Sequence, residues 1–141
     1  MTLHARQVIS GWDTVAVRFS PFLQEDLHLV SCGKENIRLW RVKDGHLPGR
    51  SLQLDALARN THFTCLAFGY NKAGRQLFPG EGLARKQQLF VGTAHGKLLQ
   101  ISYSDQKVQV VYQLHDLAIT SLCANDGFVV TASMDKYVRV W

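Results

Sequence analysis

The chain has 141 residues, of which 46% are hydrophobic and 19% are charged. This balance is typical of a folded domain with its own core and excludes an intrinsically disordered chain. Lys and Arg together number 16 against 11 for Asp and Glu, a formal net charge of +5. The excess favours an acidic partner surface over a basic one.

The sequence shows no membrane segment and no export signal. No apolar run approaches the roughly 20 residues that a membrane-spanning helix needs, and residues 1–6 lack the apolar stretch of a secretory signal. We therefore expect a cytoplasmic chain without membrane insertion. Its three cysteines, Cys32, Cys65 and Cys123, are odd in number and lie among apolar neighbours. This pattern predicts buried, reduced thiols rather than disulfides or a metal site.

The first third of the chain predicts a meander of four short strands. Residues 14–20 alternate between apolar and polar types and stop at Pro21, which cannot extend a strand ladder. Three further strands are predicted at 28–32, 37–42 and, more weakly, 51–54. The Asp44-Gly45 and Pro48-Gly49 pairs supply turn signals before the last of them.

The middle of the chain repeats this layout around an insertion. Strands are predicted at 63–68, 89–93, 97–103 and 108–114. Residues 69–88 interrupt them with glycines, a proline and almost no periodicity, which predicts a long exposed loop. Its four basic residues are Lys72, Arg75, Arg85 and Lys86.

The last part of the chain predicts three strands, at 118–123, 128–133 and 138–141, with turns at 125–127 and 134–136. Recurrence of one layout along the chain indicates a tandem array. We expect an all-β fold of about three four-stranded antiparallel units, the last incomplete. The expected bounds are 12–57, 62–116 with the insertion at 69–88, and 118–141.

The run from Phe128 to Trp141 resembles the WD-repeat family, in which each repeat forms one four-stranded blade of a β-propeller. The resemblance implies a partial propeller, because a closed ring needs more blades than this chain offers. In that family a His, a Ser or Thr, an Asp and a Trp of one repeat form a structural hydrogen-bond network. The matching positions here are His115, Thr131 or Ser133, Asp135 and Trp141.

The two earlier repeats depart from that pattern. The first has Trp40 but no Asp in its turn, which puts its network in doubt. The second has His62 and Thr93, but His95 stands at the Asp position and Ile101 at the Trp position. We therefore expect the second blade to depend on apolar packing.

Within the family, the stretches 29–40 and 64–68 and the Phe19-Ser-Pro21 strand end look like microtubule-associated WD-repeat proteins, most of all the WD repeat-containing protein 90 group. Echinoderm microtubule-associated-protein-like chains share the Cys-Gly-Lys turn and are an alternative. The resemblance implies a large centriolar and ciliary protein at the microtubule wall. Tubulin or microtubules, centriolar proteins and the remaining propeller blades are the implied partners, and the centrosome, centriole or cilium base is the implied location.

No catalytic motif is present: the sequence has neither a phosphate-binding glycine loop nor a nucleophile elbow nor a zinc-protease helix. We expect no enzyme activity, no cofactor and no metal. The expected function is an interaction scaffold, either cytoskeletal or a generic adaptor that recruits partners to an enzyme or signalling complex. The basic insertion is either solvated loop charge or a contact for an acidic surface. Nucleic acid is not expected, because Phe78 is the one aromatic residue among those charges.

Overall fold

A computed structural model describes residues 1–8, 11, 13–71, 86–125 and 127–141. Over these residues the chain forms three antiparallel sheets of four, four and three strands. The one short helical element described is the 3-10 helix η1 (Asp55–Leu57). The prediction of an all-β fold with three strand units, the last incomplete, is confirmed.

The first sheet has the strand order β1-β2-β3-β4. Its strands are β1 (Thr14–Phe19), β2 (Leu27–Gly33), β3 (Asn36–Val42) and β4 (Gly49–Ser51). The fourth strand therefore begins earlier than the predicted range of 51–54 and ends at Ser51. The reason is that Leu52 and Leu54 are buried in the core, so the chain leaves the sheet edge there and enters η1.

The second sheet has the strand order β5-β6-β7-β8. Its strands are β5 (Phe63–Tyr70), β6 (Gln87–Thr93), β7 (Lys97–Ser102) and β8 (Lys107–Gln113). The tight turn between β6 and β7 needs a glycine, because Gly96 has a φ of +78° and a Cβ there would lie 1.9 Å from the carbonyl oxygen of His115.

The third sheet consists of β9 (Ile119–Asn125), β10 (Phe128–Ser133) and β11 (Val138–Val140). Its order is β11-β10-β9. Trp141 continues the ladder beyond β11, because its backbone N–H and C=O both bond to Val129.

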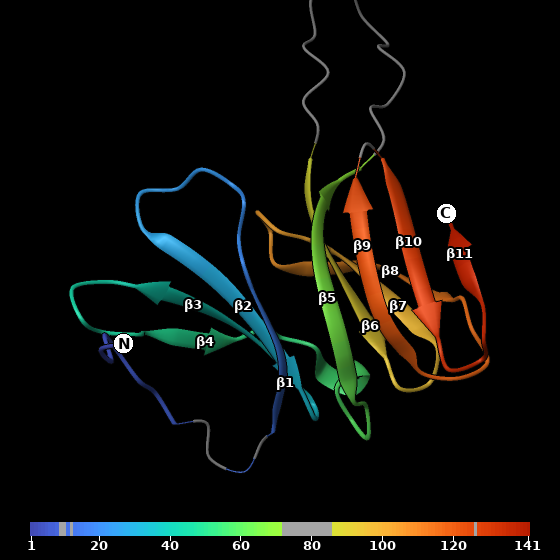
Figure 1. The fold of residues 1–141 in the computed structure, drawn as a ribbon, viewed down its shortest axis with the longest axis horizontal. Helices are drawn as coiled ribbons and strands as arrows, with labels where there is room; N and C mark the ends of the chain where they lie inside the picture. Colours follow the sequence, from blue (N-terminus) through green and yellow to red (C-terminus); the bar gives the residue numbers. More distant parts are fainter. Residues whose placement is uncertain (9–10, 12, 72–85, 126) are drawn as a thin grey trace, which may run out of the picture.

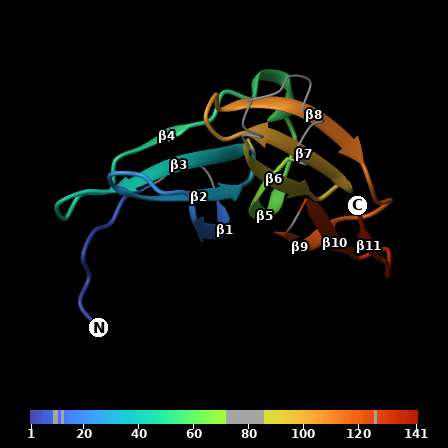
Figure 2. The ribbon, with the colours of Figure 1, turned by 90° about the horizontal axis from the view of Figure 1, so that it is seen from above.

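The sheets are arranged side by side as an arc of propeller blades. The first strand of each sheet lies on the inner side, where β5 contacts both β1 and β9. The fourth strands, β4 and β8, lie along the outer rim (Figure 2). Figure 1 shows that the end of β5, the start of β6 and the end of β9 lie at the same end of the arc.

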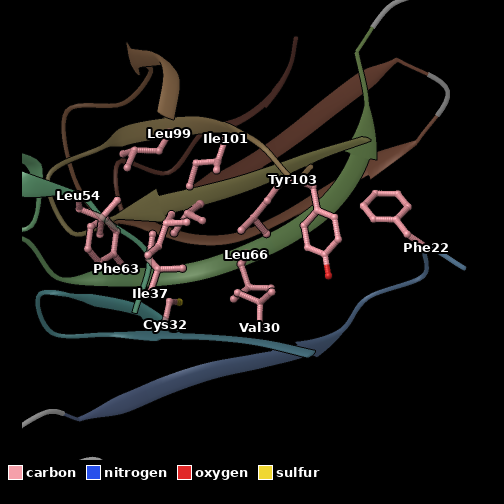
Figure 3. Close-up of a cluster of buried hydrophobic side chains, with 13 residues drawn as sticks. Phe22, Val30, Cys32, Ile37, Leu54, Phe63, Leu66, Leu99, Ile101 and Tyr103 are labelled. Carbon is pink, nitrogen blue, oxygen red and sulfur yellow. The ribbon is translucent and has the colours of Figure 1, made fainter. Parts of the chain in front are cut away.

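The cores lie between neighbouring sheets. The larger cluster fills the space between the first two sheets, with Ile37, Phe63 and Leu66 at its centre (Figure 3). Phe22 and Tyr103 close one end of it, with ring centroids 5.0 Å apart. A smaller cluster of residues from β5, β6, β7, β9 and β10 joins the second and third sheets.

The cysteines are free but not all buried, which corrects one prediction. Cys32 and Cys65 lie in the cores, whereas Cys123 is exposed on β9. Leu122, its neighbour on the opposite face of β9, packs against the second sheet, so the alternation of the strand turns Cys123 away from that core. Burial, reinforced by the neighbouring Cys65 thiol, raises the pKa of Cys32 to about 12.

Two apolar sheet faces remain exposed among the described residues. Val17 and Phe19 present one on β1, and Val138 and Val140 present the other on β11. Over the part of the chain that the structure describes, no helix is long and apolar enough to cross a membrane.

Candidate functional site

A chain of hydrogen bonds runs through the third sheet. His115 lies just before β9, Thr131 in the middle of β10, Asp135 in the turn before β11 and Trp141 directly after β11. His115 Nδ1 lies 2.8 Å from Asp135 Oδ2, and His115 Nε2 lies 2.6 Å from Thr131 Oγ1. The Trp141 indole N–H donates to Thr131 Oγ1 over 3.0 Å. The structure thus brings together four of the residues singled out in the sequence.

Donor and acceptor chemistry fixes the direction of these bonds. The indole N–H of Trp141 can only donate, and an ionised Asp135 can only accept. In the tautomer with its proton on Nδ1, His115 donates to Asp135, and its Nε2 accepts the hydroxyl proton of Thr131. The side chains of this hydrogen-bond network then donate to one another in the order Trp141, Thr131, His115, Asp135.

Asp135 also anchors the turn between β10 and β11. Its Oδ1 accepts the backbone N–H of Tyr137 at 3.0 Å, and its Oδ2 accepts that of Asp116 at 3.3 Å. Burial alone raises the pKa of this carboxyl, but the hydrogen bonds from Tyr137, His115 and Asp116 outweigh burial and hold the pKa below its ordinary value. The carboxylate is therefore the preferred state in the fold.

Ser133, the alternative to Thr131 in the predicted network, has a different partner set. Its hydroxyl accepts the backbone N–H of Asp135 at 3.1 Å and donates to the carbonyl of Leu117 at 3.1 Å. Thr131 bonds the histidine, and Ser133 shapes the turn.

Arg139 is part of this site and was missed by the sequence analysis. Its Nη1 donates to the carbonyl oxygen of Leu114 at 2.5 Å and lies 3.8 Å from Asp135 Oδ2. Its guanidinium also stacks over the Tyr137 ring at 4.6 Å. Asp135 and Arg139 are four residues apart in the sequence. Opposite charges at this spacing are neighbours on a helix, but the rule does not apply to a turn followed by a strand.

The first sheet holds a shorter version of the same arrangement. Thr131 lies two residues after Val129, the backbone partner of Trp141. Ser31 likewise lies two residues after the partner of Trp40, and the Trp40 indole N–H donates to Ser31 Oγ at 2.8 Å. Among the described residues of the first sheet, the Trp40–Ser31 pair has no hydrogen bond to an acidic side chain. At the equivalent places in the second sheet, Val91 and Ile101 are buried in the apolar core.

The remaining predicted network residues lie apart from one another. His62 is exposed, and its backbone joins the first two sheets through a bridge to Lys34 and a bond to Ala94 N–H. Thr93 Oγ1 donates to the carbonyl of Lys97 at 3.1 Å and accepts its N–H at 3.0 Å. Both residues therefore form hydrogen bonds with the backbone at turns. No hydrogen bond is found between the side chains of His62 and Thr93.

The His115 site is closed to solvent. The side chain of His115 is 0% exposed and that of Asp135 is 7% exposed. Buried polar networks whose members are all satisfied hold a fold in one arrangement. Among the described residues there is also no group of three or more His, Cys, Asp or Glu that could hold a metal ion.

The predicted basic contact lies mostly outside the described residues: Lys72, Arg75 and Arg85 belong to the part that is not described, as does Phe78. Lys86 is described and exposed. Its backbone N–H donates to Asn71 Oδ1 at 2.9 Å, and its carbonyl accepts the N–H of Asn71 at 3.1 Å. The two stems of the insertion are thus joined at the end of the hairpin between β5 and β6.

A second basic surface lies at the rim between the first and second sheets. A groove of about 620 Å³ opens there, with Arg41, Arg50 and His28 among its walls, and no acidic residue is among the described residues that line it. Arg41 makes an exposed ion pair with Asp26 at 3.6 Å. Trp40 and Tyr103 belong to the apolar part of the wall. The chemistry of this groove suits an acidic segment with some apolar surface.

The fold, the arc of sheets and the His115 network together define a propeller protein of the WD type. Residues 105–141 match the family described as WD domain, G-beta repeat. The chain is a member of the WD-repeat family.

Three curated relatives extend the likeness beyond the last repeat. The chain is 30% identical to the Centriole proteome protein 16 of Chlamydomonas reinhardtii over 100% of its own length. It is 32% identical to the WD repeat-containing protein 90 of Xenopus tropicalis, and 26% to that of Mus musculus, over 83% of its length. It spans 7% of the length of each of these relatives.

Solved structures show the same fold at low sequence identity. The computationally designed Ika4 protein matches 92% of this chain and 65% of its own, with a TM-score of 0.62 and 21% identity. A chain of the Chaetomium thermophilum Polycomb Repressive Complex 2 bound to GSK126 matches 96% of this chain and 30% of its own, with a TM-score of 0.67 and 18% identity.

Proposed function

We propose that this chain is part of a non-catalytic scaffold that serves a microtubule-associated protein of the centriole and cilium base. The observation that carries the proposal is the 30% identity to a centriole proteome protein along the entire chain. The scaffold role is supported by the arrangement of the fold, because the polar network is buried inside a blade and the exposed loops and rims are free to contact partners.

The partner surface that we propose is acidic. The net charge of +5 favours such a partner. The rim groove offers Arg50 together with Arg41, which makes an exposed ion pair with Asp26. The insertion adds Lys72, Arg75, Arg85 and Lys86 as further contacts. The carboxylate-rich outer surface of tubulin has the chemistry that these residues would bind.

We also propose that further blades of the same propeller cover the two apolar faces. Val17 on β1 and Val140 on β11 lie on these faces, and adjacent blades in propellers pack face to face. The repeat bounds proposed for this part of the ring are 12–57, 62–116 and 118–141. Alone, the chain is expected to self-associate through these faces, which light scattering after size exclusion measures.

Co-sedimentation with microtubules tests the function. The chain is expected to pellet with microtubules at low salt and less at high salt, because attraction between exposed charges is screened within about 10 Å at 0.1 M salt. An Arg41→Ser, Arg50→Ser double variant should pellet less, while an Arg59→Ser, Lys97→Ser variant removes the same charge elsewhere and serves as the control. Absence of binding, with recovery of other protein partners, would instead support an adaptor that recruits partners to an enzyme or signalling complex.

A further inference from the structure

The outer edge of the second sheet is unusually open for pairing. Among the described residues β8 pairs with β7 alone and forms the edge of its sheet. After Lys107 the strand reads Val-Gln-Val-Val-Tyr-Gln, with no charge, proline or glycine. Val110, Val111 and Tyr112 are each 38–39% exposed. A stretch of this composition at a free sheet edge is the type of segment that recruits another strand.

The other outer edges are protected in ways that β8 is not. The strand β4 has three residues with Arg50 at its centre and Pro48 just before it. The strand β11 also has three residues, with Arg139 in the middle. Short strands, proline and central charges are the usual devices against edge pairing. In β8, which has seven residues, the single charge is at the first position.

The backbone of β8 leaves a regular stretch available. A register shift between Gln100 and Ile101 leaves Gln109 unmatched, but Val110 to Gln113 pair with β7 without interruption. The N–H of Leu114 points inward, because it donates to the carbonyl of Gly96. Backbone groups alternate in direction along an antiparallel strand, so Val111 and Gln113 direct their N–H and C=O groups outward.

We propose that this edge binds β8 of a second copy of the chain in antiparallel orientation. The exposed Lys107 precedes the uncharged segment and the exposed Asp116 follows it. Among the described residues neither side chain takes part in an ion pair. Antiparallel pairing sets the Lys107 end of one copy beside the Asp116 end of the other, whereas parallel pairing sets like charges side by side. Two copies are therefore complementary both in the charges at the ends of β8 and in the outward N–H and C=O groups of its backbone.

This contact differs from the packing of blade on blade. It lies on the outer rim (Figure 2), whereas the apolar faces of β1 and β11 lie at the two ends of the arc. Pairing along β8 uses outward backbone groups and remains available when other blades cover those faces.

Hydrogen exchange of the unmodified chain at low and high protein concentration tests the proposal. The amides of Val111 and Gln113 are expected to gain protection as concentration rises, because they point outward and then donate to the second copy. Gains confined to β1 and β9–β11, with β8 unchanged, would overturn it.

A variant gives a second measure of the same contact. Val111→Lys is expected to remove the concentration-dependent protection of β8 and to weaken that association by more than about tenfold, because each copy then places a lysine on the shared edge. Gln53→Lys adds the same charge at an exposed loop position and should leave β8 protection unchanged. Equal protection in both variants, with an unchanged melting curve, would contradict edge pairing. If Val111→Lys melts early, the exchange of the unmodified chain alone decides.

Discussion

Trp40 and Ser31 hold the first sheet together in the same way as Trp141 and Thr131 hold the third. The indole N–H donates to the hydroxyl over 2.8 Å in the first sheet and over 3.0 Å in the third. The third sheet extends this pair through His115 to Asp135, whereas the first stops at the hydroxyl. The tryptophan and hydroxyl pair is therefore the shared unit, and the histidine and aspartate add the connection to the turn.

Thr131→Val should lower the free energy of unfolding by about 1–3 kcal/mol, because it leaves the buried His115 Nε2 and the partly buried indole N–H of Trp141 without partners. Thr120→Val is the matched control, since the Thr120 hydroxyl makes an exposed bond to Ala132. Denaturant midpoints of both variants measure the difference. Equal losses would mean that the buried chain of bonds adds nothing beyond an ordinary surface contact.

The carboxylate of Asp135 predicts a dependence of stability on pH. Its pKa in the fold lies below the ordinary value, so its contribution is fully present above the unfolded pKa of about 3.9 and disappears as pH falls through the folded pKa. Asp135→Asn should therefore melt earlier than the parent at pH 7, and the gap should close in acid. Melting curves from pH 7 down to about pH 2 decide.

His95→Asp tests whether the second blade accepts the missing acidic residue. His95 is exposed in the turn between β6 and β7, and the buried Val91 and Ile101 offer no polar partner for a network. We expect an unchanged or slightly raised melting temperature. A clear loss of stability would show that the imidazole makes a contact on which the turn depends.

The cysteines should differ sharply in their reaction with a thiol reagent. Cys123 is exposed and is expected to react in the folded chain at neutral pH. Cys32 is expected to react only after unfolding, because burial raises its pKa to about 12, and the buried Cys65, whose pKa is also raised, should behave the same way. Mass spectrometry of labelled peptides, with and without denaturant, gives the order in which the three cysteines react. Rapid labelling of Cys32 in the folded chain would contradict the core described here.

The insertion should add affinity for an acidic polymer that depends on salt. Replacing its four basic residues, Lys72, Arg75, Arg85 and Lys86, by Ser should weaken microtubule co-sedimentation more at low than at high salt. Replacing the exposed Lys34, Arg59, Lys97 and Lys107 by Ser removes the same charge elsewhere and controls for net charge. Equal weakening in both variants would assign the effect to net charge, and an earlier melting point would assign the insertion to packing.

Alternation and turn residues were enough to predict most of the strands. The fourth strand of the first sheet was placed too late, because Leu52 and Leu54 read as part of an alternating strand while the structure turns them into the core. The bond of Trp40 to Ser31 was not predicted, since the family pattern was sought through its acidic residue. The role of Arg139 depends on a contact with Leu114, 25 residues away, which no local pattern contains.

Because the ends of β5 and β6 are joined by hydrogen bonds, the segment between them can differ in length without changing the pairing of the two strands. Asn71 and Lys86 hold each other through backbone and side chain, so the register of β5 and β6 is set before residue 72 and after residue 85. The entropy of closing a loop grows only slowly with its length, by about 0.6 kcal/mol for each doubling. A short turn, a longer insert or a reporter peptide could therefore take the place of residues 72–85 with little effect on the rest of the sheet, which makes this hairpin the natural place to exchange one binding element for another.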